Sequence, residues 1–318
     1  QMRMFAHIAR KYDRGYGHFT TRQNIQFNWL KLEDTPDILA ELASVEMHAI
    51  QTSGNCVRNI TSDEFAGVAQ DEVVDPRPYA EILRQWSTFH PEFAYLPRKF
   101  KIAISGGKED RAAIYAHDIG LSVTKNAQGE VGFRVLVGGG LGRTPIIGVE
   151  ICEFVPWQHI FTYVESILRI YNQYGRRDNK YKARIKILVK ALGIDEFKRQ
   201  VEADWADLKE GPGTLTIEEV NRVASFFTDP AYETLTDHDS ALNEFKADSR
   251  AFSNWMMRNV KPHRVPGYAI VVLSLKKPGD APGDATAEQM EAIADLADRY
   301  SFGELRITHK QNLVLADV

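Results

Sequence analysis

The sequence Tyr95-Leu96-Pro97-Arg98-Lys99-Phe100-Lys101 runs directly into the apolar residues Ile102-Ala103-Ile104. The apolar run predicts a strand, and three cations immediately precede it. Because side chains alternate along an extended chain, Lys99 and Lys101 are expected on one face, about 7 Å apart. Two ammonium groups at that spacing repel each other unless an anion lies between them. The pattern leaves two hypotheses open: a solvated edge strand whose lysines discourage aggregation, or an anion-binding site.

Composition limits the classes of protein that need to be considered. The chain has 318 residues, is 44% hydrophobic and carries a formal net charge of -4. Its length suits two or three domains, and its slightly acidic balance gives no reason to expect nucleic acid as a partner. No apolar run approaches the ~20 residues of a membrane span and no signal-peptide pattern opens the chain. We therefore expect no membrane association, and a cytoplasmic location is the default prediction.

Two segments of the chain repeat each other. Residues 20–25 read TTRQNI and residues 308–313 read THKQNL, so Thr, Gln and Asn recur with a cation at the third position. Each segment is expected to lie in a strand that follows a helix, predicted at 1–12 and 286–299. The shared order favours internal duplication. The second copy also has a strand at 268–275 before its helix, so we expect the natural protein to have further residues at its N-terminus.

A glycine run follows the second of two predicted strands. Residues 119–124 and 131–137 are apolar and are joined by Asn126-Ala127-Gln128-Gly129, a predicted hairpin turn. Gly138-Gly139-Gly140 comes next, but a dinucleotide fingerprint would need a further glycine where Arg143 stands. The run is instead typical of backbone that closely approaches a flat ligand or a neighbouring segment.

Cationic residues form a set in this slightly acidic chain. Each one alone is most simply a surface charge. Together they favour a polyanionic ligand with carboxylates or phosphates, and a small oxyanion. The histidines show no ligand spacing, and Cys56 and Cys152 form no CxxC motif, which argues against a zinc site or a disulfide framework. The cations are Arg22, Arg58, Arg77, Arg98, Lys99, Lys101, Arg176, Arg177, Arg184 and Lys186.

These pieces together resemble the siroheme-dependent nitrite and sulfite reductases, in order and over nearly the whole chain. The Leu-Pro-Arg-Lys-Phe-Lys and Leu-Val-Gly-Gly-Gly-Leu pieces are specific, and the others are individually weak. The matching segments are Thr21 to Gln23, Asn55 to Asn59, Arg77 to Ile82, Tyr95 to Lys101, Leu136 to Leu141, Arg176 to Lys186, Arg306 to Thr308 and Gln311 to Leu313.

The resemblance implies an α+β fold, in which a pseudo-two-fold pair of ferredoxin-like half-domains accompanies an inserted mixed α/β domain. We place the first half at residues 1–70, without its N-terminal strand, the siroheme and [4Fe–4S] reductase domain at 71–255, and the second half at 256–318. Residues 207–260 are polar with little periodicity, and the sequence assigns them no role.

The resemblance also implies a six-electron reduction at siroheme iron, coupled to a [4Fe–4S] cluster and supplied by a flavoprotein or a ferredoxin. The residues that would hold the substrate oxyanion are Arg22, Arg77, Lys99 and Lys101. The residues that would bind siroheme, mainly through its carboxylates, are Arg58, Arg98, Gly138, Gly139, Gly140, Arg184, Lys186 and Gln311. Cations are needed there because unpaired negative charge is costly at low dielectric, and they can polarise the bound oxygens and deliver protons.

Lysine at both Lys99 and Lys101 resembles the sulfite-reducing branch, because plant-type nitrite enzymes carry asparagine at the second position. We therefore favour reduction of sulfite to sulfide. Reduction of nitrite to ammonia by the same scaffold is one alternative. A non-catalytic module that binds a tetrapyrrole or an anion is another.

The sequence departs from the family in its cysteines. The family ligates its cluster with four cysteines that lie downstream of the second repeat, and the two cysteines of this chain cannot supply four thiolates. We expect a fragment, truncated at both ends and inactive alone, of an active enzyme.

Overall fold

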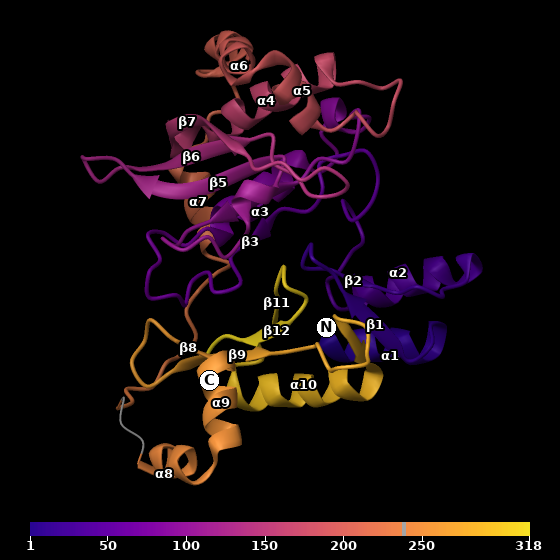
Figure 1. Cartoon of the computed structure of the whole chain (residues 1–318), viewed down its shortest axis with the longest axis vertical. Coiled ribbons are helices and arrows are strands. Elements are labelled where there is room, and N and C mark those ends of the chain that lie inside the picture. The colour runs from indigo at the N-terminus through magenta and orange to yellow at the C-terminus, as the bar shows by residue number, and fades with distance from the viewer. Residues whose placement is uncertain (237–239) are drawn as a thin grey trace. The chain divides into compact units, whose positions relative to one another are not determined.

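The computed structural model describes residues 1–236 and 240–318, and the chain divides into two compact units (Figure 1). Its mixture of helices and sheets confirms the predicted α+β class. Among the described residues, no helix is both long and apolar enough to cross a membrane. Unit 1 comprises Gln1–Ala49, Val68–Gln70 and Asp229–Val318, and unit 2 comprises Ile50–Gly67 and Asp71–Thr228.

Unit 1 contains two antiparallel sheets. The first has the strand order β10-β1-β2, formed by Asp284–Thr286, Tyr16–Phe19 and Ile25–Gln26. The second has the order β11-β12-β9-β8, formed by Arg306–Ile307, Leu313–Leu315, Ala269–Leu273 and Val260–Pro262. The helices are α1 (Met2–Tyr12), η1 (Leu32–Asp34), α2 (Thr35–Ser44), α8 (Ser240–Asp248), α9 (Arg250–Asn259) and α10 (Ala287–Tyr300).

The core of unit 1 joins the two sequence repeats, because α1 precedes one repeat and α10 the other. Phe5 and Ala9 of α1 are buried with Met290 and Ala294 of α10. Helix α10 begins with a capping box, in which the Thr286 hydroxyl accepts from the main chain of Gln289 at 3.2 Å. Apolar residues at helical spacing therefore pair the helices of the two halves.

The repeated segments are tight turns, so the prediction of continuous strands through them is wrong. Residues Thr20 and Thr308 each close a turn, with main-chain bonds from Thr20 N to Asn24 O (2.7 Å) and from Thr308 N to Asn312 O (2.9 Å). Each threonine hydroxyl also accepts from two main-chain N–H groups inside its turn, at 3.0–3.3 Å. Such side-chain bonds offer the backbone an alternative to the sheet ladder. The shared hydrogen-bond pattern of the two turns supports the predicted duplication.

Unit 2 is built on a five-stranded mixed sheet with the order β3-β4-β5-β6-β7. Strands β3 to β5 are parallel, and β6 and β7 continue the sheet in antiparallel fashion. The predicted hairpin between β5 and β6 is confirmed, with Asn126 N donating to Glu130 O at 3.0 Å. The strands are Thr61–Ser62, Ile102–Ser105, Ile119–Lys125, Val131–Val137 and Val149–Pro156.

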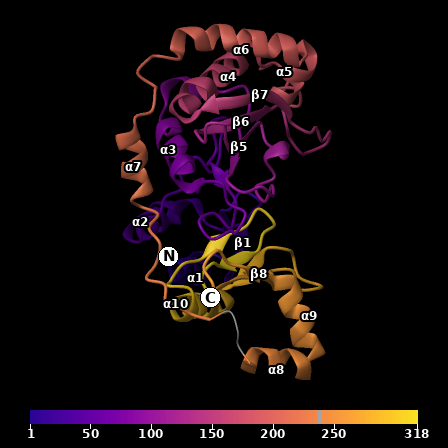
Figure 2. The same ribbon diagram turned by 90° about the vertical axis from the view of Figure 1, so that its left-hand side faces the viewer.

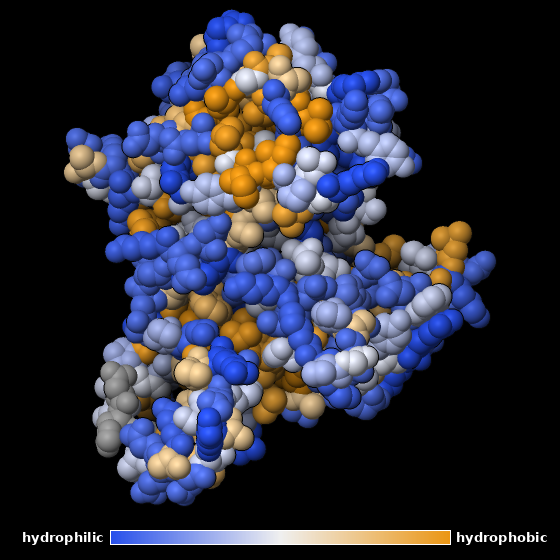
Figure 3. All heavy atoms as spheres, viewed as in Figure 1, coloured by the Kyte–Doolittle hydropathy of each residue, from blue (hydrophilic) through white to orange (hydrophobic). Residues whose placement is uncertain are grey.

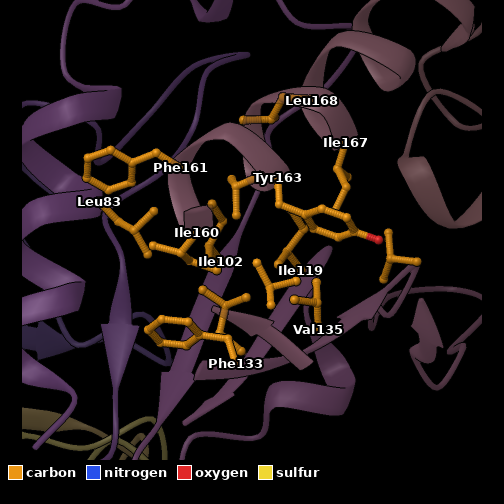
Figure 4. Close-up of a cluster of buried hydrophobic side chains, with 14 of the residues drawn as sticks. Leu83, Ile102, Ile119, Phe133, Val135, Ile160, Phe161, Tyr163, Ile167 and Leu168 are labelled. Atoms are coloured by element: carbon orange, nitrogen blue, oxygen red, sulfur yellow. The ribbon is translucent and has the colours of Figure 1, made fainter. Parts of the chain in front are cut away.

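Helix α4 forms the centre of the unit 2 core. Its residues Tyr163 and Ile167 are fully buried together with Ile102 of β4 and Phe133 of β6 (Figure 4). Helices α4, α5 and α6 gather on the β7 side of this unit (Figures 1 and 2). The helices of unit 2 are α3 (Arg77–Ser87), η2 (Pro91–Phe93), η3 (Ile114–Ala116), η4 (Trp157–His159), α4 (Ile160–Tyr174), α5 (Ile185–Leu192), α6 (Ile194–Leu208) and α7 (Ile217–Ala224).

The lysine-rich segment precedes the regular strand and does not lie within it. Strand β4 begins only at Ile102, while Phe100 forms an isolated parallel bridge with Val57. Phe100 is fully buried, and Lys99 and Lys101 are partly buried. The bulky phenylalanine enters the core just before the regular strand, so the two lysines lie at the entrance to the sheet rather than along it.

Candidate anion and cofactor site

One edge of the unit 2 sheet brings distant parts of the sequence together. Because β3, β4 and β5 are parallel and β6 is antiparallel to β5, the start of the first three strands and the end of β6 share this edge. Ile119, at the start of β5, pairs with both Ile102 and Val137. The residues just outside this edge are Arg58 before β3, Lys99 and Lys101 before β4, Asp118 before β5 and Gly138 after β6.

Asp118 connects several of the predicted site residues. Its side chain is fully buried and accepts hydrogen bonds from Arg184 Nε (2.9 Å) and Nη2 (2.7 Å) and from the main-chain N of Lys101 (2.9 Å). Its carbonyl oxygen accepts from Gly138 N at 3.0 Å. Burial raises the pKa of the Asp118 carboxyl, and the Arg184 guanidinium opposes that shift. The sequence analysis missed Asp118, whose only signal is an acidic residue directly before a buried strand.

Positive charge exceeds negative charge around Lys99. Burial lowers the pKa of the Lys99 ammonium, and Arg58, Arg98 and Arg184 lower it further, while Asp118 opposes them. Burial also lowers the pKa of Arg58, and the positive charge of Arg98 adds a smaller decrease. Within residues 1–236 and 240–318, the Lys99 ammonium and the Arg98 guanidinium make no hydrogen bond or ion pair. We call Arg58, Arg98, Lys99, Lys101, Asp118 and Arg184 the cation cluster.

Arg58 and Lys186 are held in place by main-chain carbonyl groups. Arg58 donates to Gly54 O at 3.1 Å and to Thr52 O at 2.7 Å, which fixes the loop before β3. Lys186 is buried, and its ammonium donates to the carbonyl oxygens of residues 140, 141 and 144 at 3.4, 3.0 and 2.7 Å. Because three carbonyl oxygens surround this ammonium, its direct role is to hold the loop after the glycine run.

The glycine run is required by close neighbours. A Cβ atom on Gly139 would lie 2.3 Å from Tyr115 O and 2.5 Å from His117 O. Gly138 has a φ of +76°, and a Cβ on Gly140 would lie 2.9 Å from Arg184 Nη2. Of the two interpretations left open by the sequence, approach to neighbouring backbone is the one that Gly139 displays.

Arg77 and the two lysines lie near different ends of strand β4. Arg77 lies at the first turn of α3 and pairs with Asp75 at 2.8 Å. Its guanidinium also lies against Gly67, where an added Cβ would be 2.0 Å from Nη2. The segment before it packs on Gly106, directly after β4. Arg77 is therefore near the end of β4 and the lysines are near its start, a relation that the sequence could not reveal before strand direction was known.

A second charged centre lies beyond the ends of β3 and β4. Buried Arg111 pairs with Asp63 at 2.9 Å and with Asp71 at 2.7 Å. Nearby Glu72 accepts from Gly67 N at 2.8 Å, and burial is the main reason why its pKa is raised to about 7. Burial also raises the pKa of Asp63. We call Asp63, Asp71, Glu72, Asp75, Arg77, Glu109 and Arg111 the acid-rich centre.

Arg22 and Gln311 belong to unit 1, where they occupy the two repeated turns. Gln311 has a φ of +61°, and its side-chain amide donates to Phe19 O at 3.0 Å. Its Nε2 also lies 3.1 Å from Nε2 of His18, which in turn contacts Asp284 at 2.7 Å. Gln311 therefore links the second repeat to the first within unit 1.

The residues of this chain fit one of the two predicted cofactors better than the other. A surplus of cations at a partly buried edge suits the carboxylates of siroheme. The thiols of Cys56 and Cys152 are both partly buried, and burial raises the pKa of each. No group of three or more potential metal ligands occurs in the part of the chain that the structure describes. The chain's own residues thus match siroheme binding and do not supply a ligand set for a [4Fe–4S] cluster.

Comparison with protein families gives two matches that cover most of the chain. The nitrite and sulphite reductase 4Fe-4S domain matches residues 53–208, and the nitrite/sulfite reductase ferredoxin-like half domain matches residues 1–45 and 262–318. The chain belongs to the siroheme-dependent nitrite and sulfite reductase family. The predicted family is thereby confirmed, together with its cofactors, siroheme and a [4Fe–4S] cluster.

Curated relatives carry both activities in their names. The chain is 32% identical over 218 residues to sulfite reductase [ferredoxin] 1 of Mycolicibacterium paratuberculosis, a match that covers 68% of this chain and 39% of the relative. It is 31% identical over 334 residues to the assimilatory ferredoxin-dependent nitrite reductase of Haloferax mediterranei, covering 100% of this chain and 52% of the relative.

A solved structure agrees with this assignment. The NirA protein of Mycobacterium tuberculosis is 25% identical and superposes with a TM-score of 0.76, over 100% of this chain and 51% of that one. This chain spans about half the length, or less, of the relatives described here.

Proposed function

We propose that this chain forms part of a siroheme reductase, in which the cation cluster holds the carboxylates of the cofactor and the oxyanion substrate. The surplus of positive charge around Lys99 is the observation that carries the proposal. Arg58, Arg98 and Arg184 all lower the pKa of Lys99 electrostatically, whereas Asp118 opposes them. Cations gathered at a partly buried edge repel one another, and an anionic ligand would relieve that cost.

The cluster could do two kinds of chemical work. Guanidinium groups match carboxylates through paired hydrogen bonds, which suits Arg98 and Arg184 to the cofactor. The lowered pKa of Lys99 makes its ammonium a better proton donor than an exposed lysine. We assign Lys99 and Lys101 to the oxyanion. We place Arg58 beside them, because among the three arginines its charge lowers the pKa of Lys99 the most. Arg77 lies near the other end of β4.

The loop after the glycine run adds an apolar surface near this edge. Leu141 and Ile147 are 65% and 70% exposed, and each directly follows one residue of the antiparallel bridge between Gly140 and Ile146. Figure 3 shows that the visible face of the molecule is mainly hydrophilic but that hydrophobic side chains gather over part of unit 2. Exposed aliphatic groups next to surplus cations suit a flat ring with anionic edges. Siroheme, when bound, would supply the iron at which the substrate is reduced.

We propose sulfite, reduced to sulfide, as the substrate, because both Lys99 and Lys101 are lysine. Nitrite, reduced to ammonia, is the second candidate, supported by the printed names of relatives such as the Haloferax mediterranei enzyme. The word "ferredoxin" in the names of the Mycolicibacterium paratuberculosis and Haloferax mediterranei relatives supports a ferredoxin as the electron donor. Arg22 and the proposed domain bounds, 1–70, 71–255 and 256–318, remain part of this proposal, as does a cytoplasmic location.

Substitution of Lys101 tests the choice of substrate in the complete, cofactor-loaded protein. The variant Lys101→Asn removes one cation from the oxyanion site, which should harm the more highly charged sulfite more than nitrite. We expect the ratio of kcat/KM for sulfite to that for nitrite to fall about tenfold, equivalent to about 1.4 kcal/mol. An unchanged ratio would contradict the assignment of Lys101 to the substrate.

A binding measurement tests the proposal without activity. Uroporphyrin III is a metal-free tetrapyrrole rich in carboxylates, and its fluorescence reports binding to the chain. We expect saturable binding at one equivalent, weakened by salt because the attraction is between charges. The control variant Lys190→Met, which removes an exposed lysine of α5, should bind as the unchanged chain does. Absence of saturable binding would contradict the proposed cofactor site.

A further inference from the structure

We propose that Asp118 is a positioning residue of the cation cluster: its carboxylate fixes the Arg184 guanidinium and the main chain of Lys101 so that the cluster can receive a polyanionic ligand. This inference rests on the proposed function. It adds a buried acidic residue to a site that otherwise consists of cations and glycines.

The geometry gives Asp118 contacts to three segments at once. One carboxylate oxygen accepts two bonds from Arg184, and the other accepts the main-chain N–H of Lys101. Its own carbonyl accepts from Gly138, at the start of the glycine run. The side chain of Asp118 is fully buried, so water cannot replace these partners. Loss of the carboxylate would release a main-chain segment and a guanidinium together.

Arg184 keeps a donor that Asp118 does not use. The carboxylate takes the Nε and Nη2 donors, and within the described parts of the chain Nη1 of Arg184 donates no hydrogen bond. A guanidinium held on one side can present its remaining donors in a fixed direction, which favours recognition of a second carboxylate. Arg184 is mostly buried, with a side-chain exposure of 14%.

Asp118 also influences the pKa of Lys99. The carboxylate raises the pKa of Lys99 against the combined effect of Arg58, Arg98 and Arg184. A neutral side chain at position 118 should therefore lower the pKa of Lys99 further, and the ammonium would lose its proton at a lower pH. The charged or titratable groups that act on Asp118, or on which it acts, are Lys99, Lys101, Tyr171, Arg184 and Lys186.

The test compares Asp118→Asn with Asp298→Asn, which removes an exposed carboxylate paired with Arg3 in unit 1. The probe is uroporphyrin III, and the NMR titration of the Lys99 side chain provides a second readout that a purely structural role would not move. We expect Asp118→Asn to bind about tenfold more weakly and to titrate Lys99 at a lower pH, with Asp298→Asn unchanged in both. Unchanged affinity and unchanged Lys99 titration in a folded Asp118→Asn protein would overturn the inference.

A double-mutant cycle with Arg184→Gln separates positioning from general damage. If Asp118 acts through Arg184, the two substitutions should be strongly non-additive in binding, and additive losses would overturn the inference. If Asp118→Asn does not fold, Arg184→Lys is used in its place, because it keeps the positive charge but loses the paired N–H donors of the guanidinium. We expect this variant to bind uroporphyrin III about tenfold more weakly. Equal binding by that variant would overturn the inference. Failure of the unchanged chain to bind would instead overturn the proposed function.

Discussion

Unit 2 carries two buried arginine–carboxylate centres at opposite ends of its parallel strands, and they differ in what surrounds them. At the start of β4 and β5, Arg184 pairs with Asp118 among further cations. Beyond the ends of β3 and β4, Arg111 pairs with Asp63 and Asp71 among further carboxylates. Both arginines are mostly buried, with side-chain exposures of 14% and 8%.

The contrast shows that a buried ion pair alone does not mark a ligand site. In the acid-rich centre, Arg111 and Arg77 each have carboxylate partners within the chain. In the cation cluster, the Lys99 ammonium and the Arg98 guanidinium have no hydrogen-bonding or ion-pair partner among the described residues. Charged side chains without a partner in a partly buried place are costly unless a ligand pairs with them. We therefore interpret the acid-rich centre as structural and the cation cluster as a ligand site.

Removal of Arg111 should have the largest effect on stability. The variant Arg111→Ala leaves Asp63, whose side chain is 1% exposed, as a buried unpaired carboxylate. We expect a loss of about 3–5 kcal/mol in the free energy of unfolding, measured by urea denaturation near pH 7.5. The matched control Arg176→Ala removes an exposed arginine that pairs with Asp178, and it should leave the free energy of unfolding nearly unchanged. A loss below about 1 kcal/mol for Arg111→Ala would refute a structural role for the acid-rich centre.

Substitution in the glycine run should have the next largest effect. In Gly139→Ala the added methyl group would meet two carbonyl oxygens, those of Tyr115 and His117, at 2.3 and 2.5 Å. We expect a loss of about 2–3 kcal/mol in unfolding free energy, with weaker uroporphyrin binding because His117 precedes Asp118. In the control Gly148→Ala the methyl group would meet the same Tyr115 oxygen at 3.3 Å. Equal stability of the two variants would show that the run does not pack as tightly as described.

Glu72 should make the stability of the acid-rich centre depend on pH. Its pKa is raised from an ordinary 4.5 to about 7, so the folded chain binds this proton more tightly than the unfolded chain does. The resulting stability is fully present below pH 4.5 and is lost as the pH rises through about 7. Solvent screening reduces the effect, because Glu72 is only partly buried, to about 2 kcal/mol.

Unfolding free energies of the native chain and of Glu72→Gln, measured at pH 4.5 and pH 7.5, check this expectation. The neutral glutamine cannot lose a proton, so the variant should lack that part of the fall in stability between the two pH values. If both chains lose the same stability over this interval, Glu72 does not have the raised pKa.

Local sequence patterns predicted the β5–β6 hairpin and the duplication of unit 1, and the family resemblance predicted the α+β class. The same patterns could not reveal that the repeated Thr-x-x-Gln-Asn segments turn, because their threonine hydroxyls compete with the sheet ladder. They also could not show that the regular strand begins only at Ile102, with the buried Phe100 bridged to Val57 before it.

The candidate site was predicted only in part, because local sequence patterns do not show which distant segments the fold brings together. The motifs around Lys99, Arg58 and Arg184 were found because each is locally cationic, and the strand order brings them to one edge. Asp118 was missed because its importance comes from three segments distant in sequence. Arg77 was grouped with the lysines on the family resemblance, and the sequence does not indicate at which end of β4 each residue lies.

The central claim is that surplus charge at the start of β4, rather than the acid-rich centre, binds the anionic ligand. Titration of uroporphyrin III into Lys99→Met and Arg77→Met tests it most directly, since each variant removes one cation at one end of the same strand. We predict that Lys99→Met binds about tenfold more weakly and that Arg77→Met binds within about twofold of the unchanged chain. Loss of binding in Arg77→Met, with unchanged binding in Lys99→Met, would contradict the account.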